Sequence, residues 1–290
     1  MNTEAPSGPE SLPPPSRSSS MIPPPPRPET LFEQYERRTL ALLEHLGEVV
    51  LLTRRTARMV FKRPFEGRAI LHQLDSLGVK SMGIVATTSI FIGMVMTIQF
   101  AFGLSRFGGL EYIPRVVVLS FARELAPTLT AVIVGGRIGS GMAAEVGAMN
   151  VTEQVDAIRA LGADPAKKLV LPRIIAAMTV MPILSTYALV LGTLGAVIIC
   201  DVQFGIAPQF FVRSSLEAVL LSDFWSGVAK TPVFGFLIAI IGCHFGLRTT
   251  GGTEGVGTST TRTVVVVSIS ILMADFVLTK LFIAFGGGAS

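Results

Sequence analysis

Residues 81–101 read SMGIVATTSIFIGMVMTIQFA and contain no charged side chain. A run of about 20 apolar residues is long enough for a helix to cross the hydrocarbon core of a bilayer. Backbone N–H and C=O groups find no water in that core, so a helix, which pairs them internally, is the favoured structure. These residues therefore predict a transmembrane helix and make the chain an integral membrane protein.

The composition of the whole chain agrees with this prediction. Of its 290 residues, 50% are hydrophobic and 15% are charged, whereas soluble domains carry about 25% charged residues. The mean hydropathy is +0.60. We expect an all-α integral membrane protein with about five spans, at about 81–102, 116–137, 172–200, 228–247 and 263–285.

Two segments precede the first span. Residues 1–30 are rich in Pro and Ser, a composition that favours a disordered tail. Residues 31–63 show apolar residues at helical spacing followed by a cluster of basic residues. Charges interrupt this second segment too often for a span, so we expect an amphipathic helix in the headgroup layer. Residues 31–286 then form one membrane domain.

The distribution of basic residues predicts the orientation. They concentrate before the first span, between spans two and three, and between spans four and five. The other side has only Arg106, Arg115 and Arg213. The positive-inside rule places the N-terminus in the cytoplasm and the C-terminus outside. Because the positive charge flanks apolar segments, the net charge of +4 does not indicate nucleic acid as a partner.

The loop between spans two and three is the most informative. Residues 145–162 read EVGAMNVTEQVDAIRALG. Asn150 and Glu153 resemble a capping box that starts a helix, and Gly162 suits its end. An apolar stripe of Val151, Val155 and Ile158 would oppose a face of Thr152, Glu153, Asp156 and Arg159. This helix either rests on lipid headgroups or docks in a groove of a cytoplasmic partner; its acidic residues would be repelled by an anionic leaflet.

Charges within the spans raise a second question. Arg123 and Glu124 interrupt the second span, and Lys230 and Asp275 lie in the fourth and fifth. Such residues are costly in a membrane unless they pair or face a cavity. They either lock helices together or line a polar spot on a substrate path. Gly135 and Gly139 permit a close helix contact, within one chain or at a dimer seam.

The sequence offers no catalytic constellation. His45, His72 and His244 lack metal-ligand spacing, and Cys200 and Cys243 read as apolar packing residues. The glycines of 251–257 lack the Lys-Ser/Thr of a nucleotide-binding loop and predict a tight turn. We therefore expect neither a metal nor a cofactor, and no covalent chemistry.

The chain resembles the MlaE (YrbE) family of lipid permeases over residues 35–286. The motifs that carry the resemblance are FIGMV at 91–95 with Gln99, RELAP at 123–127, GRIG at 136–139, AEVG at 144–147, TEQVDA at 152–157, DP at 164–165, LPR at 171–173, GVG at 255–257, TTRTV at 260–264 and DFVLT at 275–279. Ala126 and Thr253 are small departures from the family pattern, and the Pro-rich N-terminus is not typical of it.

The resemblance implies the permease subunit of an ABC transporter in the bacterial inner membrane that moves phospholipids or related lipids. It implies a homodimer, a separate cytoplasmic ATPase subunit, periplasmic MCE-domain proteins and, in many members, a STAS-domain protein. The helix at 150–161 would be the coupling helix that docks in the ATPase. The docking residues would be Glu145, Val151, Glu153, Val155, Asp156, Ile158 and Arg159. Spans one and five would line a lipid cavity at the dimer axis, with Phe91, Val95, Ile98, Gln99, Phe102, Arg123, Glu124 and Asp275 as its candidate residues.

Two other functions remain open from the residues themselves. An ion-coupled secondary transporter could use Arg123, Glu124 and Asp275 as a proton relay. A membrane scaffold subunit without a transport path would also need the docking helix. The sequence shows no internal repeat of the kind that builds many secondary transporters, which speaks against the first of these.

Overall fold

The computed structural model describes residues 31–60 and 67–286, in which short connections join helices. The predicted tail at 1–30 lies outside the described residues. The segment up to Glu44 and the segment from His45 onward are separate compact units. The helices are α1 (Leu31–Val60), α2 (Gly67–Leu74), η1 (Asp75–Val79), α3 (Lys80–Ser105), η2 (Leu110–Tyr112), α4 (Ile113–Ser120), η3 (Phe121–Leu125), α5 (Ala126–Val151), α6 (Gln154–Ala160), η4 (Ala166–Val170), α7 (Leu171–Phe204), α8 (Pro208–Ala218), α9 (Leu221–Leu247) and α10 (Gly252–Gly286).

Within the described residues, five helical segments are long and apolar enough to cross a membrane, which confirms the all-α fold with five spans. They are Gly67–Ser105, Leu110–Val151, Ala166–Phe204, Leu221–Leu247 and Gly252–Ala284. Each begins before one predicted span; the first four contain that span completely, and the fifth ends one residue before the predicted end at 285. The predicted helix at 31–63 is present as α1, and its position in the headgroup layer remains a prediction.

The start of the last span is a clear correction. The glycine-rich residues 251–257 were expected to form a turn, but only Gly251 and Gly252 have positive φ, and α10 begins at Gly252. The early start coincides with close packing that the glycine pattern does not reveal. Gly255 lies directly against the preceding loop, where a Cβ would clash with the carbonyl oxygen of Thr250. The hydroxyls of Thr258 and Thr261 donate to the carbonyls of Glu254 and Gly257, so these polar side chains find partners within the helix.

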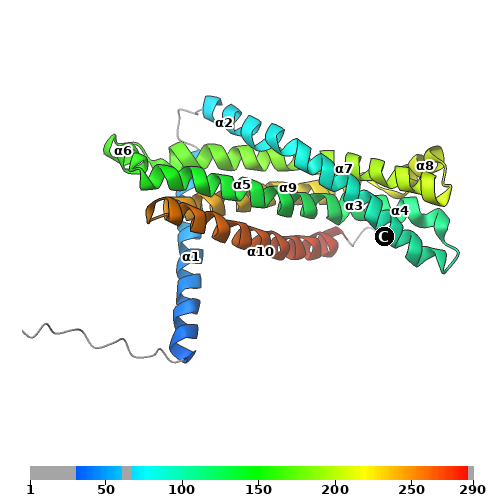
Figure 1. Ribbon diagram of the computed structural model, residues 1–290, viewed down its shortest axis with the longest axis horizontal. Coiled ribbons are helices and arrows are strands. Elements are labelled where there is room, and N and C mark those ends of the chain that lie inside the picture. The colour runs from blue at the N-terminus through cyan, green and yellow to red at the C-terminus, as the bar shows by residue number, and fades with distance from the viewer. Residues whose placement is uncertain (1–30, 61–66, 287–290) are drawn as a thin grey trace, which may run out of the picture. The chain divides into compact units, whose positions relative to one another are not determined.

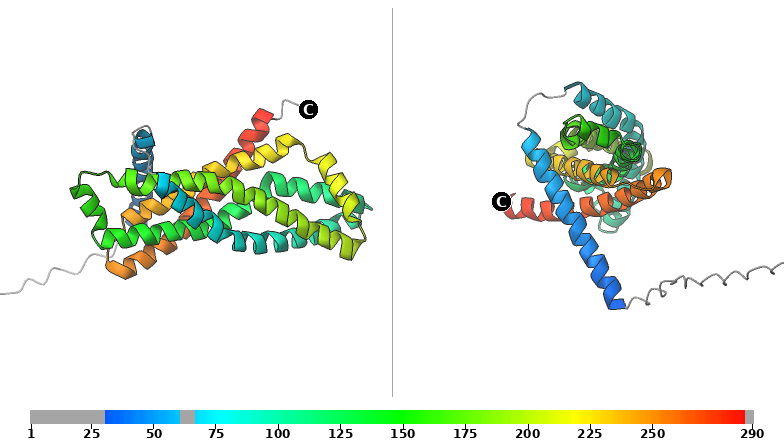
Figure 2. Two further views of the ribbon diagram at one scale, coloured as in Figure 1. Left: turned by 90° about the horizontal axis from the view of Figure 1, so that it is seen from above. Right: turned by 90° about the vertical axis from the view of Figure 1, so that its left-hand side faces the viewer.

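The spanning helices run side by side along one direction (Figures 1 and 2). Helix α5 packs against α9 and α10, α3 packs against α7, and α7 packs against α9. Helix α6 lies at one end of this bundle, and α4 and α8 lie at the other (Figure 1). We call these the α6 end and the α8 end.

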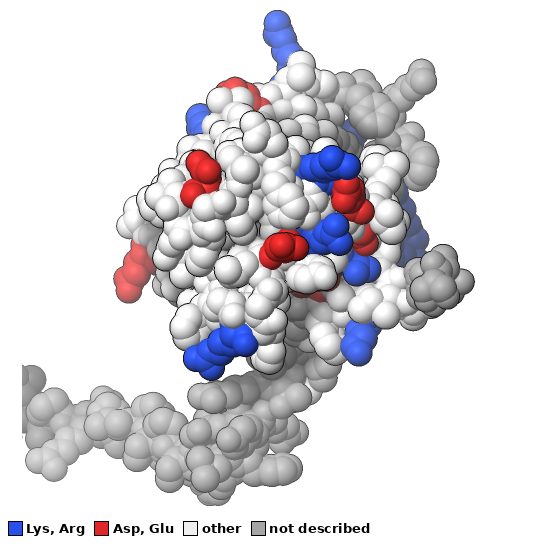
Figure 3. All heavy atoms as spheres, turned by 90° about the vertical axis from the view of Figure 1, so that its right-hand side faces the viewer, with Lys and Arg blue, Asp and Glu red and all other residues white. Residues whose placement is uncertain are grey.

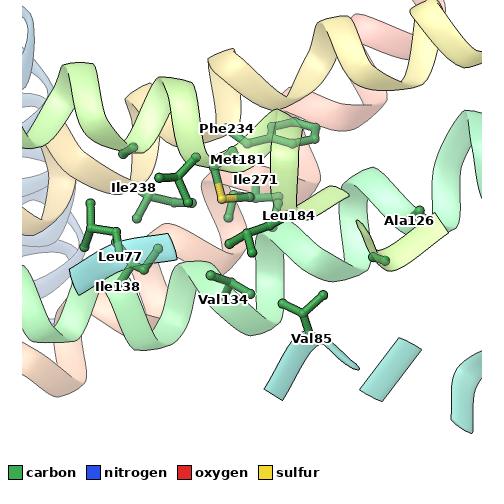
Figure 4. Close-up of a cluster of buried hydrophobic side chains, with 14 of the residues drawn as sticks. Leu77, Val85, Ala126, Val134, Ile138, Met181, Leu184, Phe234, Ile238 and Ile271 are labelled. Atoms are coloured by element: carbon green, nitrogen blue, oxygen red, sulfur yellow. The ribbon is translucent and has the colours of Figure 1, made fainter. Parts of the chain in front are cut away.

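Apolar side chains from all five spanning segments fill the interior (Figure 4). Val134 and Ile138 of α5 meet Met181 and Leu184 of α7, with further contributions from Val85, Phe234, Ile238 and Ile271. Gly135 and Gly139 lie in this interior. A Cβ on Gly135 would come within 3.0 Å of Ile238, and one on Gly139 within 3.2 Å of Thr263. The small-residue pattern therefore serves packing within one chain.

Helix α8 was not predicted from the sequence. Arg213 and Glu217 pair on its exposed face with 3.2 Å between Nε and Oε1. Arg115 reaches the same carboxylate and also donates from its Nε to the hydroxyl of Ser214 at 3.1 Å. Figure 3 views this end of the bundle and shows acidic and basic side chains close together. These contacts join α8 to α4.

Helices α3 and α7 lie very close together where a glycine of one faces a glycine of the other. A Cβ on Gly93 of α3 would lie 2.0 Å from the carbonyl oxygen of Gly192 in α7. Backbone cannot move aside as a flexible side chain can. We therefore predict that Gly93→Val lowers the free energy of unfolding by about 3 kcal/mol, the upper range for overpacking a tight interior. Thermal unfolding of the purified protein in detergent would measure this loss.

Gly83 provides the control for that substitution. It lies in the same helix, but no atom stands within 4 Å of the position that its Cβ would occupy. Gly83→Val should leave the unfolding temperature close to that of the unmodified protein. Equal effects of the two substitutions would show that the close contact between α3 and α7 does not limit stability.

Candidate functional site

A cluster of charged and hydroxyl groups lies inside the spanning part of the bundle. The Nζ of Lys230 is 2.8 Å from Oε2 of Glu124 and 3.3 Å from Oδ1 of Asp275. It also donates to the hydroxyl of Thr279 at 2.7 Å, and that hydroxyl contacts both carboxylate oxygens of Glu124. The Lys230 side chain is only 2% exposed. We call Glu124, Lys230, Asp275 and Thr279 the polar cluster.

The local backbone explains how Glu124 reaches Lys230. Glu124 belongs to η3, a π-helical turn inserted between α4 and α5. π turns are rare and are frequent at functional sites. Gly227 of α9 lies directly against this turn, because a Cβ there would be 2.0 Å from the carbonyl oxygen of Ala122. This close approach brings Lys230, one helical turn further along α9, to the carboxylate.

Arg123 and Glu124 have different partners, although they are neighbours in sequence. The Nε of Arg123 lies 3.4 Å from Oδ1 of Asp223, at the start of α9. The other carboxylate oxygen of Asp223 accepts a hydrogen bond from the backbone N–H of Leu220 and so caps the helix. Arg123 is about half exposed. Its guanidinium is therefore anchored at one edge and open at the other.

A pocket of about 480 Å³ opens next to the polar cluster. One part of its wall is polar and the other is apolar. The lining residues are Met96, Phe100, Leu119, Ser120, Arg123, Glu124, Leu125, Ser226, Lys230, Thr279, Phe282 and Ile283. Such a wall matches a ligand with a polar or charged end and an apolar body.

The predicted cavity residues fall into two groups. Arg123 and Glu124 line this pocket, and Asp275 belongs to the polar cluster. Phe91, Val95, Ile98, Gln99 and Phe102 instead lie exposed on α3, outside the pocket. The α3 residues on the pocket wall are Met96 and Phe100, which sequence reasoning missed. Because α3 is apolar all round its circumference, the pattern of its residues could not indicate which face lines a pocket.

Two spanning helices, α3 and α10, leave broad apolar faces without a partner among residues 31–60 and 67–286. In the most apolar part of α9, 61% of the residues are buried, whereas in the most apolar part of α10 only 11% are buried. Phe276 of α10 is 65% exposed, and Phe91 of α3 is 61% exposed. Exposed apolar faces of this size mark contacts with lipid or with another protein.

The corner before α6 differs from the prediction. Asn150 was expected to cap the helix, but it lies in the last turn of α5, and its side-chain amide donates to the carbonyl of Thr249 at 3.0 Å. The chain turns at Glu153, whose φ is 60°, and α6 begins at Gln154 without a side-chain cap. The predicted capping box is wrong, because the Asn150 side chain bonds to the connection between α9 and α10 instead.

The rest of the loop follows the prediction. Gly162 has a φ of 75°, and its N–H donates to the carbonyl of Arg159. The N–H of Ala163 donates to the carbonyl of Ile158, and the two bonds together form a Schellman motif at the end of α6. Val155 is fully buried against the bundle, and Val151 and Ile158 are half-buried beside it. The exposed face carries Glu153, Asp156 and Arg159. Leu161 follows at the tip and is 86% exposed.

Glu145 lies in α5 and not on α6. Its Oε2 accepts a hydrogen bond from Nη2 of Arg173 at 2.9 Å, and Arg173 also donates from Nη1 to the carbonyl of Leu169. The Arg173 side chain is buried. Glu145 therefore ties the end of α5 to the start of α7, and the two helices carry α6 between them.

Residues 31–60 and 67–286 hold no group of three or more His, Cys, Asp or Glu side chains arranged to hold a metal ion. The polar cluster contains two carboxylates, and both accept from Lys230. Its chemistry is that of a buried ion pair with hydrogen bonds.

Comparison with known proteins gives the family. A family model described as permease MlaE matches residues 70–281. A protein of Synechocystis named as a probable ABC transporter permease is 41% identical over 246 residues, which cover 84% of this chain and 94% of that protein. A protein of Rickettsia bellii with the same name is 37% identical over 246 residues, covering 85% and 95%. The chloroplastic protein TRIGALACTOSYLDIACYLGLYCEROL 1 of Arabidopsis thaliana is 40% identical over 236 residues, covering 81% of this chain but only 65% of that protein. With five apolar helices and a family match over most of its length, the chain belongs to the MlaE permease family.

Proposed function

We propose that this chain is the transmembrane permease subunit of an ABC transporter that moves phospholipids or related lipids between the inner membrane and periplasmic MCE-domain proteins. The observation that carries the proposal is the pocket beside the polar cluster. It combines an apolar wall with the buried Lys230 and the partly exposed Arg123 and Glu124 inside a spanning bundle. A lipid has the matching division, with a charged headgroup and apolar chains.

Arg123 is the residue best suited to meet the headgroup. Lys230 is held by two carboxylates, whereas Arg123 is anchored at Nε only and lines the pocket. A guanidinium offers several donors in one plane and binds phosphate oxygens through two of them. Met96 and Phe100 would then contact the first part of the acyl chains. The name of the Arabidopsis relative, which contains that of a glycerolipid, supports this class of substrate.

A second copy of the chain would complete the lipid path. The apolar faces of α3 and α10 are exposed in the single chain, and they include Phe91, Val95, Ile98 and Phe102 together with Phe276. In a homodimer these faces would enclose a cavity much larger than the pocket within one chain. Gln99 would add a polar group to its wall. The pocket with Arg123, Glu124 and Asp275 would then form the polar margin of the cavity.

The ATPase subunit would bind at the α6 end and transmit its conformational change to the permease there. We assign this end to the cytoplasm, since the basic loops between spans two and three and between four and five lie there. Glu153, Asp156, Arg159 and Leu161 form an exposed surface on and around α6, which would dock in the ATPase subunit. Val151, Val155 and Ile158 face the bundle and would hold this surface in place, and Glu145 would brace it through Arg173.

ATP-dependent lipid movement in vesicles tests the function. The chain would be reconstituted with its ATPase subunit in vesicles that contain a fluorescent phospholipid. We expect lipid movement that needs hydrolysable ATP and persists when the proton gradient is collapsed. Movement driven by a proton gradient without ATP would favour an ion-coupled transporter built on the polar cluster. A complex that binds the ATPase but moves no lipid would favour a scaffold.

Two isoleucine substitutions, compared in the same vesicles, test the position of the cavity. Ile98 of α3 lies on the face assigned to the cavity, and Ile183 of α7 is exposed on another spanning helix. Ile98→Arg should reduce the lipid transport rate about tenfold or more, because an unpaired charge would enter an apolar path. Ile183→Arg is the control for inserting arginine into a span. Equal transport by the two variants would refute the position of the cavity.

A further inference from the structure

A second pocket lies toward the α6 end of the bundle, between η1 and α5. It has a volume of about 260 Å³. Its lining residues are Gln73, Ser76, Leu77, Lys80, Arg137, Ile138, Gly141, Met142 and Glu145. We call it the η1–α5 pocket. Arg137 and Glu124 are 13 positions apart in sequence, which corresponds to about 20 Å along a helix. The η1–α5 pocket is therefore separate from the pocket at the polar cluster.

The charge of this pocket is positive and uncompensated. Within 31–60 and 67–286, Lys80 and Arg137 form no ion pair with a carboxylate. Glu145 lines the same pocket, but its carboxylate is paired with Arg173. Asp75, the acidic residue of η1, does not line the pocket. Two cations thus face one small cavity, and neither has a carboxylate partner among the described residues.

The fold positions one of these cations. The Nη1 of Arg137 donates to the hydroxyl of Ser81 at 2.7 Å, and that hydroxyl donates in turn to the carbonyl of Leu77 at 2.6 Å. Ser81 is fully buried. This chain of hydrogen bonds fixes one edge of the guanidinium and leaves its other donors for a ligand. Ser76 and Gln73 add a hydroxyl and an amide to the wall.

The floor of the pocket is apolar. Leu77, Ile138 and Met142 supply it, and Gly141 leaves the space above it open, since nothing lies within 4 Å of the position of a Cβ there. A site with cations and neutral donors at its rim and apolar side chains below fits a phosphate that is attached to an apolar group. We propose that the η1–α5 pocket binds the phosphate of an anionic lipid, at headgroup depth and apart from the transport path.

The amount of lipid that stays bound to the purified chain tests the proposal. The full chain would be purified in detergent and incubated with phosphatidylglycerol, phosphatidylcholine or inorganic phosphate, and bound lipid would be counted by native mass spectrometry. We expect phosphatidylglycerol to be retained more than phosphatidylcholine, with inorganic phosphate unable to displace it. Lys80→Gln combined with Arg137→Gln should lower this retention about tenfold, which corresponds to the loss of charge-assisted hydrogen bonds.

Two further variants make the result specific. Arg68→Gln removes an exposed cation of α2 that does not line the pocket, and it should leave retention unchanged. Gly141→Leu keeps both cations and the bond to Ser81 but fills the open space, and it should lower retention as much as the double variant. Equal losses with Arg68→Gln, or full retention with Gly141→Leu, would overturn the site in favour of general attraction to the positive surface. Displacement by inorganic phosphate would overturn the lipid as the ligand. The proposal does not depend on the transported lipid.

Discussion

Replacing Lys230 with methionine should abolish lipid transport and lower the free energy of unfolding by about 3 kcal/mol. Lys230 is 2% exposed and holds the carboxylates of Glu124 and Asp275. Its removal leaves the carboxylates of Glu124 and Asp275 without their shared cation, and breaking a buried ion pair on one side costs about 3–5 kcal/mol. We expect the lower end of this range, because the Glu124 side chain is 40% exposed and solvent screens its charge. Thermal unfolding in detergent and lipid transport in vesicles would measure the two effects.

A compensated variant separates stability from transport. Lys230→Met combined with Glu124→Gln and Asp275→Asn removes the whole ion pair, and replacing both sides of a buried pair is often neutral for stability. We expect the triple variant to recover most of the lost stability but not the transport rate. If it also recovers transport, the polar cluster only holds the helices together. Gln99→Met, an exposed position of α3 outside the pocket, serves as the control for stability.

Reversing the charges of Glu153 and Asp156 should prevent the ATPase subunit from binding. Both carboxylates are exposed at the tip of the α6 end, and Asp156 is paired only with the exposed Arg159, at 2.6 Å. Complementary charges determine which partners associate, and like charges across an interface cost several kcal/mol. Glu153→Lys with Asp156→Lys should therefore lower the amount of ATPase that co-purifies at least about tenfold.

The matching control is at the α8 end. Glu111→Lys reverses an exposed charge in η2, close to α4, and should leave ATPase binding unchanged. Leu161→Ser provides a second measurement at the α6 end, because it removes an exposed apolar contact without changing the charge. Normal ATPase binding by the double-lysine variant would refute docking at α6.

Much of the fold could be predicted because lipid restricts the choice of structures. A long uncharged stretch such as 81–101 crosses a membrane as a helix, because a helix pairs its own backbone groups. The other spans were predicted from similar apolar runs, although charged residues interrupt the second, fourth and fifth. The ends of the helices were less predictable. Helix α10 begins at Gly252, within a glycine-rich polar stretch whose composition predicts a turn. The π turn η3 was not predicted, and Gly227 of α9, more than 100 positions away, packs against it at the carbonyl of Ala122.

The candidate site, too, was predictable in part. The charges within the spans indicated that Arg123, Glu124, Lys230 and Asp275 matter, since isolated charges are costly there. The sequence also offered Lys230 and Asp275 as partners for each other or for Arg123 and Glu124, and Lys230 does pair with Asp275 and Glu124. The pairing of Arg123 with Asp223 was not predicted, because these two residues lie about 100 positions apart in the sequence. Thr279 carried a weaker signal, because a threonine is common in spanning helices.

The left-handed backbone of Glu153 has a consequence for substitutions at this position. Among the described residues, Glu153 is the non-glycine residue with a positive φ, and this conformation costs about 1 kcal/mol for a residue with a Cβ. Glycine or asparagine would relieve that strain at the same corner. Glu153→Gly should therefore make the backbone of this corner more stable while it removes a charge from the surface that we propose for docking. Stability and ATPase binding would then change in opposite directions through a single residue.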